Sequence, residues 1–127
     1  MAARDTERLM EAYVDAINTG DLDRLEPLLA PNVTLHAPPH TDRFPQNVIA
    51  RLRQERRIFP NLRIDVERAF TDTDGSLGVL VARWSGRKLS SRICLLFQIE
   101  CGRIVEIEPY GGLMKTMYDA GLLKIAS

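Results

Sequence analysis

The stretch SRICLLFQIECGRIVEIEPYGG, residues 91–112, contains two apolar segments joined by a short polar break. Apolar residues recur at alternate positions on both sides of Cys101-Gly102, which is the pattern of two β-strands around a two-residue turn. The stretch therefore predicts an antiparallel hairpin, with strands at residues 90–100 and 103–110. Gly111-Gly112 ends the second strand.

Two more strands are predicted before this hairpin. Residues 61–70 alternate apolar with charged side chains, which is typical of a half-buried strand. Residues 71–75 read Thr-Asp-Thr-Asp-Gly and predict a turn. Residues 77–85 then form an apolar strand that Gly86-Arg87-Lys88 separates from the hairpin. Four strands that follow one another in this way predict an antiparallel meander.

The first half of the chain has a helical period instead. Apolar residues at positions 9, 10, 13, 14 and 17 form one stripe and predict a helix over residues 4–18, which Gly20 ends. Two further helices are predicted over residues 21–30 and 46–59, with a short β-like run at 33–36 and a polar loop at 41–43 between them. A last helix is predicted over residues 113–123. Helices followed by a meander define an α+β fold, and 127 residues suit one domain, 1–127.

Composition excludes several classes of function. Lys+Arg and Asp+Glu both number 17, so no net charge favours nucleic acid. Every apolar run is far shorter than the roughly 20 residues of a membrane span, and the N-terminus has no signal-peptide pattern. We therefore expect a soluble, cytoplasmic protein without membrane or nucleic-acid partners. Two cysteines outside a CxxC pattern, the absence of an HExxH motif and the absence of a glycine-rich phosphate loop predict no metal and no cofactor.

Four segments carry a family resemblance. YVDAINTGDLD (13–23), followed by LLAPNV (28–33), resembles the opening of SnoaL-like proteins in the nuclear transport factor 2-like superfamily. FPNLR (59–63) and GRIVE (102–106) resemble two later motifs of the same group. The resemblance implies a strongly curved antiparallel sheet wrapped around the N-terminal helices to form a cone-shaped apolar pocket. It also implies a homodimer that pairs through the sheets.

Members of this superfamily with known chemistry place a carboxylate or a histidine inside the apolar cavity, where desolvation raises a carboxyl pKa. Many relatives have an aspartate just after the aromatic position of the last strand, but residues 109–112 contain no acid here. The nearest carboxylate is Glu108, which shares strand parity with Tyr110, Glu106 and Ile104. If that face lines the cone, Glu108 is the general acid/base and Tyr110 donates a hydrogen bond to the substrate.

An alternative remains for these strand residues. Glu106 and Glu108 also fit a solvated stripe, with Val105 and Ile107 facing the core. His36 is the second catalytic candidate, because it resembles the histidine that often closes the first strand of SnoaL-like sequences. A single histidine before a Pro-Pro turn also fits a residue that only hydrogen-bonds a loop carbonyl.

The remaining candidates would bind substrate. Trp84 and Arg92 lie on neighbouring predicted strands and suit a planar, oxygenated ligand if both face one pocket. The alternative is that Trp84 packs in the core while the arginines pair with Asp65 and Glu67. The resemblance places four helix-side residues along the cavity wall, although the same spacing describes plain core: Tyr13, Ile17, Leu52 and Phe59.

Three functions fit these observations. The first is a cofactor-independent enzyme of the cyclase or isomerase type, which transfers protons on a small hydrophobic oxygenated molecule. The second is a non-catalytic small-molecule binding protein, which the absence of an acid at residues 109–112 favours. The third is a module that holds a protein partner through its sheet.

Overall fold

The structure is a computed structural model that describes residues 3–37 and 40–111. All the described helices lie in the first half of the chain, two strands stand between the second and third of them, and four strands follow. In chain order the elements are α1 (Ala3–Thr19), the 3₁₀ helix η1 (Leu22–Leu28), β1 (Leu29–Ala37), β2 (His40–Arg43), α2 (Pro45–Ile58), β3 (Arg63–Thr71), β4 (Leu77–Gly86), β5 (Leu89–Glu100) and β6 (Arg103–Gly111).

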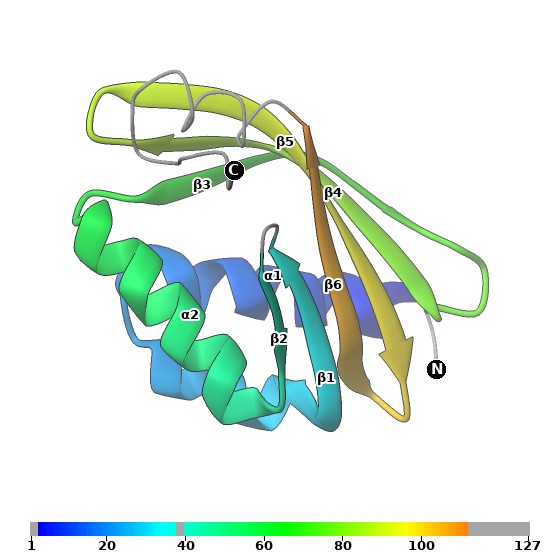
Figure 1. Ribbon diagram of the computed structural model, residues 1–127. Coiled ribbons are helices and arrows are strands. Elements are labelled where there is room, and N and C mark those ends of the chain that lie inside the picture. Colours follow the sequence, from blue (N-terminus) through cyan, green and yellow to red (C-terminus); the bar gives the residue numbers. More distant parts are fainter. Residues whose placement is uncertain (1–2, 38–39, 112–127) are drawn as a thin grey trace, which may run out of the picture.

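The strands form one six-stranded sheet in the order β2-β1-β6-β5-β4-β3. All neighbours pair antiparallel except β1 and β6, which are parallel. The sheet is strongly curved, and both helices lie on its concave side (Figure 1). The expected α+β fold, a curved sheet wrapped around the N-terminal helices, is confirmed.

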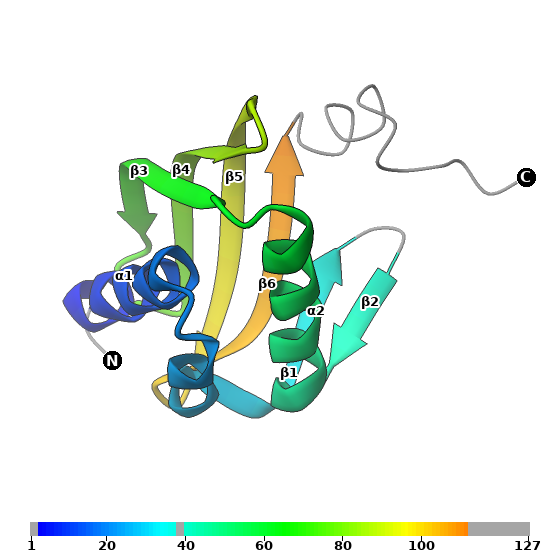
Figure 2. The ribbon, with the colours of Figure 1, turned by 90° about the vertical axis from the view of Figure 1, so that its left-hand side faces the viewer.

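The two helices cover different parts of the concave face. α1 lies across β3 and β4, whereas α2 lies against β1 and β2 (Figure 2). Each helix buries its apolar stripe against the sheet, as the helical period predicts. The following core side chains are less than about a tenth exposed: Met10, Tyr13, Ile17, Leu25, Val33, Val48, Phe59, Leu80, Trp84, Phe97, Ile104 and Ile107.

The predicted hairpin at Cys101-Gly102 is confirmed. Glu100 pairs with Arg103, and both turn residues have positive φ, 51° at Cys101 and 75° at Gly102. A two-residue turn of this kind matches the twist of the strands it joins. The turn sets the register of β5 against β6 and thereby decides which side chains share a face.

Three segments differ from the sequence-based expectation. The second helix is a 3₁₀ helix that ends at Leu28, because Pro27 lies inside it, and Leu29 already begins β1. The segment expected as a polar loop forms strand β2, which pairs with β1 from Arg43 to His40. The sheet also contains the parallel pair β1–β6, which a meander does not predict. The helix expected over residues 113–123 lies outside the described residues.

Candidate functional site

A glutamate of α2 is directed at a tryptophan on the concave side of the sheet. Glu55 lies three residues after Leu52 and four before Phe59, so all three share one side of the helix. Phe59 is 2% exposed, and its ring meets that of Trp84 edge-on with centroids 4.7 Å apart. The indole Nε1–H of Trp84 donates a hydrogen bond to Glu55 Oε1 at 3.0 Å. The amphipathic period of α2 therefore carries a carboxylate into the apolar core.

The surroundings of Glu55 perturb its ionisation. Glu55 is half-buried, and its carboxyl group lies against the buried indole of Trp84. Burial raises the pKa of Glu55, and the hydrogen bond from Trp84 offsets part of that rise. A carboxyl whose pKa is raised in this way exchanges protons closer to neutral pH than an exposed glutamate does.

Tyr13 of α1 lies close enough to Glu55 to respond to its charge. Burial raises the pKa of the Tyr13 phenol, and the negative charge of Glu55 raises it further. The ring is 2% exposed and packs edge-on against Phe97 at 5.2 Å. The raised pKa keeps the Tyr13 phenol protonated, so its hydroxyl can act as a hydrogen-bond donor.

Five predicted substrate-binding residues lie together on this concave side. Tyr13, Phe59 and Trp84 adjoin Glu55, Ile17 is 5% exposed on the same stripe of α1 as Tyr13, and Leu52 packs half-buried against the core. Their apolar surroundings desolvate the Glu55 carboxyl.

The two predicted catalytic residues, His36 and Glu108, also lie together, but on the convex face. His36 Nε2 lies 2.6 Å from Glu106 Oε1 and 3.7 Å from Glu108 Oε1. The Tyr110 hydroxyl donates a hydrogen bond to Glu108 Oε2. This bond is the main cause of a raised pKa at Tyr110. We call these four residues, His36, Glu106, Glu108 and Tyr110, the convex cluster.

The register of β6 explains why this cluster faces away from the helices. Ile107 pairs with Phe97, whose ring packs against Tyr13 of α1, so Ile107 faces the core and its neighbours Glu106 and Glu108 do not. The face of Glu108 therefore does not line the cone. A bulge at Val105, between the pairs Ile99–Ile104 and Gln98–Glu106, also turns Ile104 to the core side. The expected shared parity of Ile104 with Glu108 is wrong for this reason.

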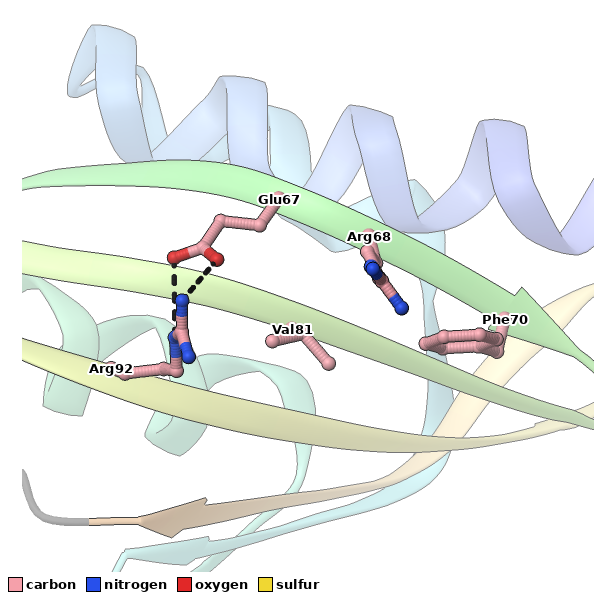
Figure 3. Close-up of a pocket in the computed structure, with 5 residues that line it drawn as sticks. All are labelled: Glu67, Arg68, Phe70, Val81 and Arg92. Atoms are coloured by element: carbon pink, nitrogen blue, oxygen red, sulfur yellow. Dashed lines mark hydrogen bonds and ion pairs between the residues drawn. The ribbon is translucent and has the colours of Figure 1, made fainter.

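Arg92 and Trp84 do not share a pocket, contrary to the sequence-based possibility. Arg92 pairs with Arg83 in the strand register and Trp84 pairs with Ser91, so the two side chains lie on opposite faces of the sheet. Arg92 instead donates to Glu67 Oε2 at 2.8 Å, which matches the alternative of an arginine paired on the outer face. A groove of about 390 Å³ lies beside this pair, lined by Glu67, Arg68, Phe70, Val81 and Arg92 (Figure 3).

Sequence reasoning missed Glu55 because it stands in the run Arg-Gln-Glu-Arg-Arg, which has the composition of a solvated helix face. The spacing of Glu55 along the helix is the sequence signal that could have identified it. Val48, Leu52, Glu55 and Phe59 recur at steps of four, three and four residues, so Glu55 continues an apolar stripe.

The comparisons with known proteins agree with this geometry. A curved, open sheet with helices on its concave side is the architecture of the nuclear transport factor 2-like class of small α+β domains. The model of the SnoaL-like domain matches residues 10–107, and the chain belongs to this family. A comparison with curated proteins gave no match.

Solved structures of several proteins have the same fold. Bal32a, from a soil-derived mobile gene cassette, superposes with a TM-score of 0.84 at 15% identity, over 92% of this chain and 96% of its own. A proposed polyketide cyclase from Sinorhizobium meliloti gives 0.76 at 19% identity, over 87% and 100%. An epoxide hydrolase from M. tuberculosis gives 0.71 at 17% identity, over 94% and 96%. At these identities the likeness establishes the fold alone.

None of the described helices has both the length and the apolar character that crossing a membrane requires.

Proposed function

We propose that the chain is a cofactor-independent enzyme that transfers protons on a small, hydrophobic, oxygenated molecule bound at the concave face. One observation carries the proposal: the carboxyl group of Glu55 accepts a hydrogen bond from the buried Trp84 close to Tyr13, and burial raises its pKa. A desolvated carboxylate is a stronger base than a solvated one, and a positioned base typically accelerates proton transfer by about 10²–10⁴-fold.

The residues around Glu55 have separate roles in this proposal. Glu55 removes a proton from the carbon next to a substrate carbonyl. The Tyr13 hydroxyl donates a hydrogen bond to the carbonyl oxygen, on which negative charge develops as that proton leaves. Trp84 orients the Glu55 carboxylate through its Nε1–H, and Glu55 then returns the proton to another carbon or to an oxygen. The sequence of steps is that of an isomerase or of a cyclase, and it needs no external oxidant or reductant.

One relative with this fold is described as a proposed polyketide cyclase, and another is described as an epoxide hydrolase. Both descriptions concern small organic molecules with oxygen atoms, which agrees with apolar walls around the Glu55 carboxylate. They support the substrate class that we propose and do not select one reaction within it.

The test is proton exchange on a panel of cyclic ketones and β-keto esters in D₂O, followed by loss of the α-proton signals in ¹H NMR. We expect the native chain to accelerate exchange for some of the panel and Glu55→Gln to reduce that acceleration by at least about 100-fold. Tyr13→Phe should reduce it by about 10-fold or more, because the oxyanion loses its donor.

Glu108→Gln and His36→Asn are the matched controls on the convex face. If Glu55 is the base, both should leave exchange within about twofold of the native rate. Exchange that is lost in Glu108→Gln and retained in Glu55→Gln would overturn the proposal and transfer the role to the pair predicted from the sequence.

The non-catalytic alternative has its own readout. Trp84 is the single tryptophan of the chain and contacts Glu55 directly, so its fluorescence should respond to a ligand at this site. Saturable quenching by panel compounds without any proton exchange would favour a binding protein over an enzyme.

We also propose that the chain forms a homodimer through the convex face of β3 and β4. Phe70 is 51% exposed there, and Val79 and Val81 beside it are half-buried. These three side chains lie next to one another in the register, because Phe70 pairs with Val79 and Arg68 with Val81. A second copy would cover this apolar patch together with the groove in Figure 3.

A further inference from the structure

We propose that His36, Glu106 and Glu108 of the convex cluster form a binding site for a divalent transition-metal cation such as Zn²⁺. Each residue offers one ligand atom, and the three atoms all lie within 4.8 Å of one another. His36 Nε2 is 2.6 Å from Glu106 Oε1 and 3.7 Å from Glu108 Oε1. One imidazole and two carboxylates therefore converge on one point of the surface.

These separations fit coordination after small side-chain rotations. Imidazole nitrogen and carboxylate oxygen bind Zn²⁺ at about 2.0–2.2 Å, so two ligand atoms in a tetrahedral site lie roughly 3.4 Å apart. One observed separation is shorter than this and the other is longer. The side chains of His36 and Glu106 are 35% and 30% exposed, which leaves them room to move without a change in the backbone.

The backbone holds the three residues on a rigid frame. Glu106 and Glu108 are two residues apart on β6, so they project from one face of the strand. Strand β1 runs parallel to β6 with Thr34 opposite Glu106, which places His36, two residues later, beside Glu108. Ligands on neighbouring strands keep their relative positions better than ligands on loops.

The charges of the cluster also favour a dication. Two ionised carboxylates carry two negative charges, whereas one imidazole carries at most one positive charge. Across residues 3–37 and 40–111, no arginine or lysine forms an ion pair with Glu106 or Glu108. A divalent cation would neutralise both carboxylates at once.

Tyr110 supports the site from its outer side. Its hydroxyl donates to Glu108 Oε2, which leaves Oε1 directed toward His36. A hydrogen bond to the non-coordinating oxygen is a common way to orient a carboxylate ligand.

The donor set indicates the class of ion. An imidazole nitrogen favours Zn²⁺, Cu²⁺ or Ni²⁺ over Mg²⁺ and Ca²⁺, which prefer oxygen ligands. Three protein ligands leave at least one coordination position for water or an oxygen of another molecule. This site lies on the convex face, so it is independent of the proton transfer proposed for Glu55.

The experiment titrates the full chain, freed of metal with EDTA, with ZnCl₂ at pH 7.5 in an isothermal calorimeter. We expect one equivalent to bind, with affinity reduced at least tenfold in His36→Ala and in Glu106→Gln. The matched controls are His40→Ala and Glu100→Gln, which remove an exposed histidine and an exposed glutamate elsewhere. Cys101→Ser tests the exposed thiol. All three should bind Zn²⁺ as the native chain does.

A second measurement guards against variants that fail to fold. The chain has only two histidines, so ¹⁵N-histidine labelling of the native protein gives one ring-nitrogen signal set for each. Saturable shifts at His36 with His40 unmoved would support the site. Unmoved His36 signals at 1 mM ZnCl₂, equal drift of both histidines, or native affinity in His36→Ala would overturn it.

Discussion

At the scale of single residues, the charge state of Glu55 depends on a balance between burial and one hydrogen bond. Burial favours the neutral carboxyl, whereas the Trp84 N–H favours the carboxylate. The folded chain therefore binds a proton at Glu55 more tightly than the unfolded chain does. The difference in stability between the native chain and a variant without this ionisable group should therefore depend on pH.

We predict that Glu55→Gln becomes more stable relative to the native chain as pH rises above 4.5, the ordinary pKa of the group. Below that pH the carboxyl is neutral in both the folded and the unfolded state, so the native chain pays no charging penalty. As pH rises through the raised folded pKa, ionising the buried carboxyl destabilises the native chain, and the amide does not ionise.

Urea unfolding at pH 4.5, 6 and 8 measures the effect as the difference in midpoint between variant and native chain. Glu100→Gln, at an exposed glutamate, is the control and should give a difference that stays flat with pH. A flat difference for Glu55→Gln would mean that its carboxyl is solvated in the folded protein.

At the scale of elements, β6 shows how one extra residue changes the chemistry of a face. The alternation of residues 103–110 predicts the strand itself, and the strand is present. The bulge at Val105 shifts the alternation of side chains between the two faces of β6. Residues before the bulge therefore face the opposite side from the one that the residues after it would predict. Bulges leave no reliable mark in a single sequence, which is why the shared face of Ile104 and Glu108 was predicted wrongly.

Asn18 joins helix α1 to strand β3 and gives a prediction at this scale. Its Nδ2 donates to Ile64 O at 2.9 Å, and its Oδ1 accepts from Ile64 N–H at 2.7 Å. Asn18→Ala leaves the N–H and C=O groups of Ile64, which is 6% exposed, without these partners. We therefore expect the substitution to lower the free energy of unfolding by about 1–3 kcal/mol.

Chemical denaturation of Asn18→Ala beside Asn47→Ala measures this cost. Asn47 makes one exposed side-chain bond, to Arg43 O, so its removal should cost less than about 1 kcal/mol. Equal costs at the two positions would show that the contact between α1 and β3 does not depend on the Asn18 amide.

At the scale of the whole molecule, the two faces of the sheet have different proposed roles, with proton transfer on the concave side and metal binding and dimerisation on the convex face. On the concave side, Glu55 of α2 contacts Trp84 of the sheet, whereas the convex face carries the convex cluster near β1 and an apolar patch on β3 and β4. An apolar patch left open to water favours association with another surface.

We predict that Val81→Arg converts a dimer to a monomer, because it places a charge at the centre of the patch formed with Phe70 and Val79. Sedimentation velocity at about 10–100 μM should give a native dimer and at least a tenfold weaker association in the variant. Glu11→Arg, on the exposed side of α1, adds the same side chain elsewhere and should remain dimeric. A native chain that is monomeric throughout this range would contradict the proposed homodimer.

The sequence by itself determined where most helices and strands of this protein form, through the spacing of its apolar residues. Helical spacing identified α1 and α2, alternation identified β3 to β6, and Cys101-Gly102 identified the hairpin, because these patterns depend on residues close together in the chain. The helical spacing placed Tyr13, Ile17 and Phe59 on apolar faces, and all three are buried, as is Trp84, for which core packing was one of two alternatives.

Only the tertiary structure decided which faces meet. The parallel pairing of β1 with β6 brings His36 to Glu106 and Glu108 across a separation of about 70 residues, and the register of β6 places this cluster on the convex face of the curved sheet, away from the helices. The same curvature encloses Glu55 beside Trp84, 29 residues further along the chain. A carboxylate is desolvated only by side chains that arrive from other elements, so its pKa and its role belong to the folded molecule.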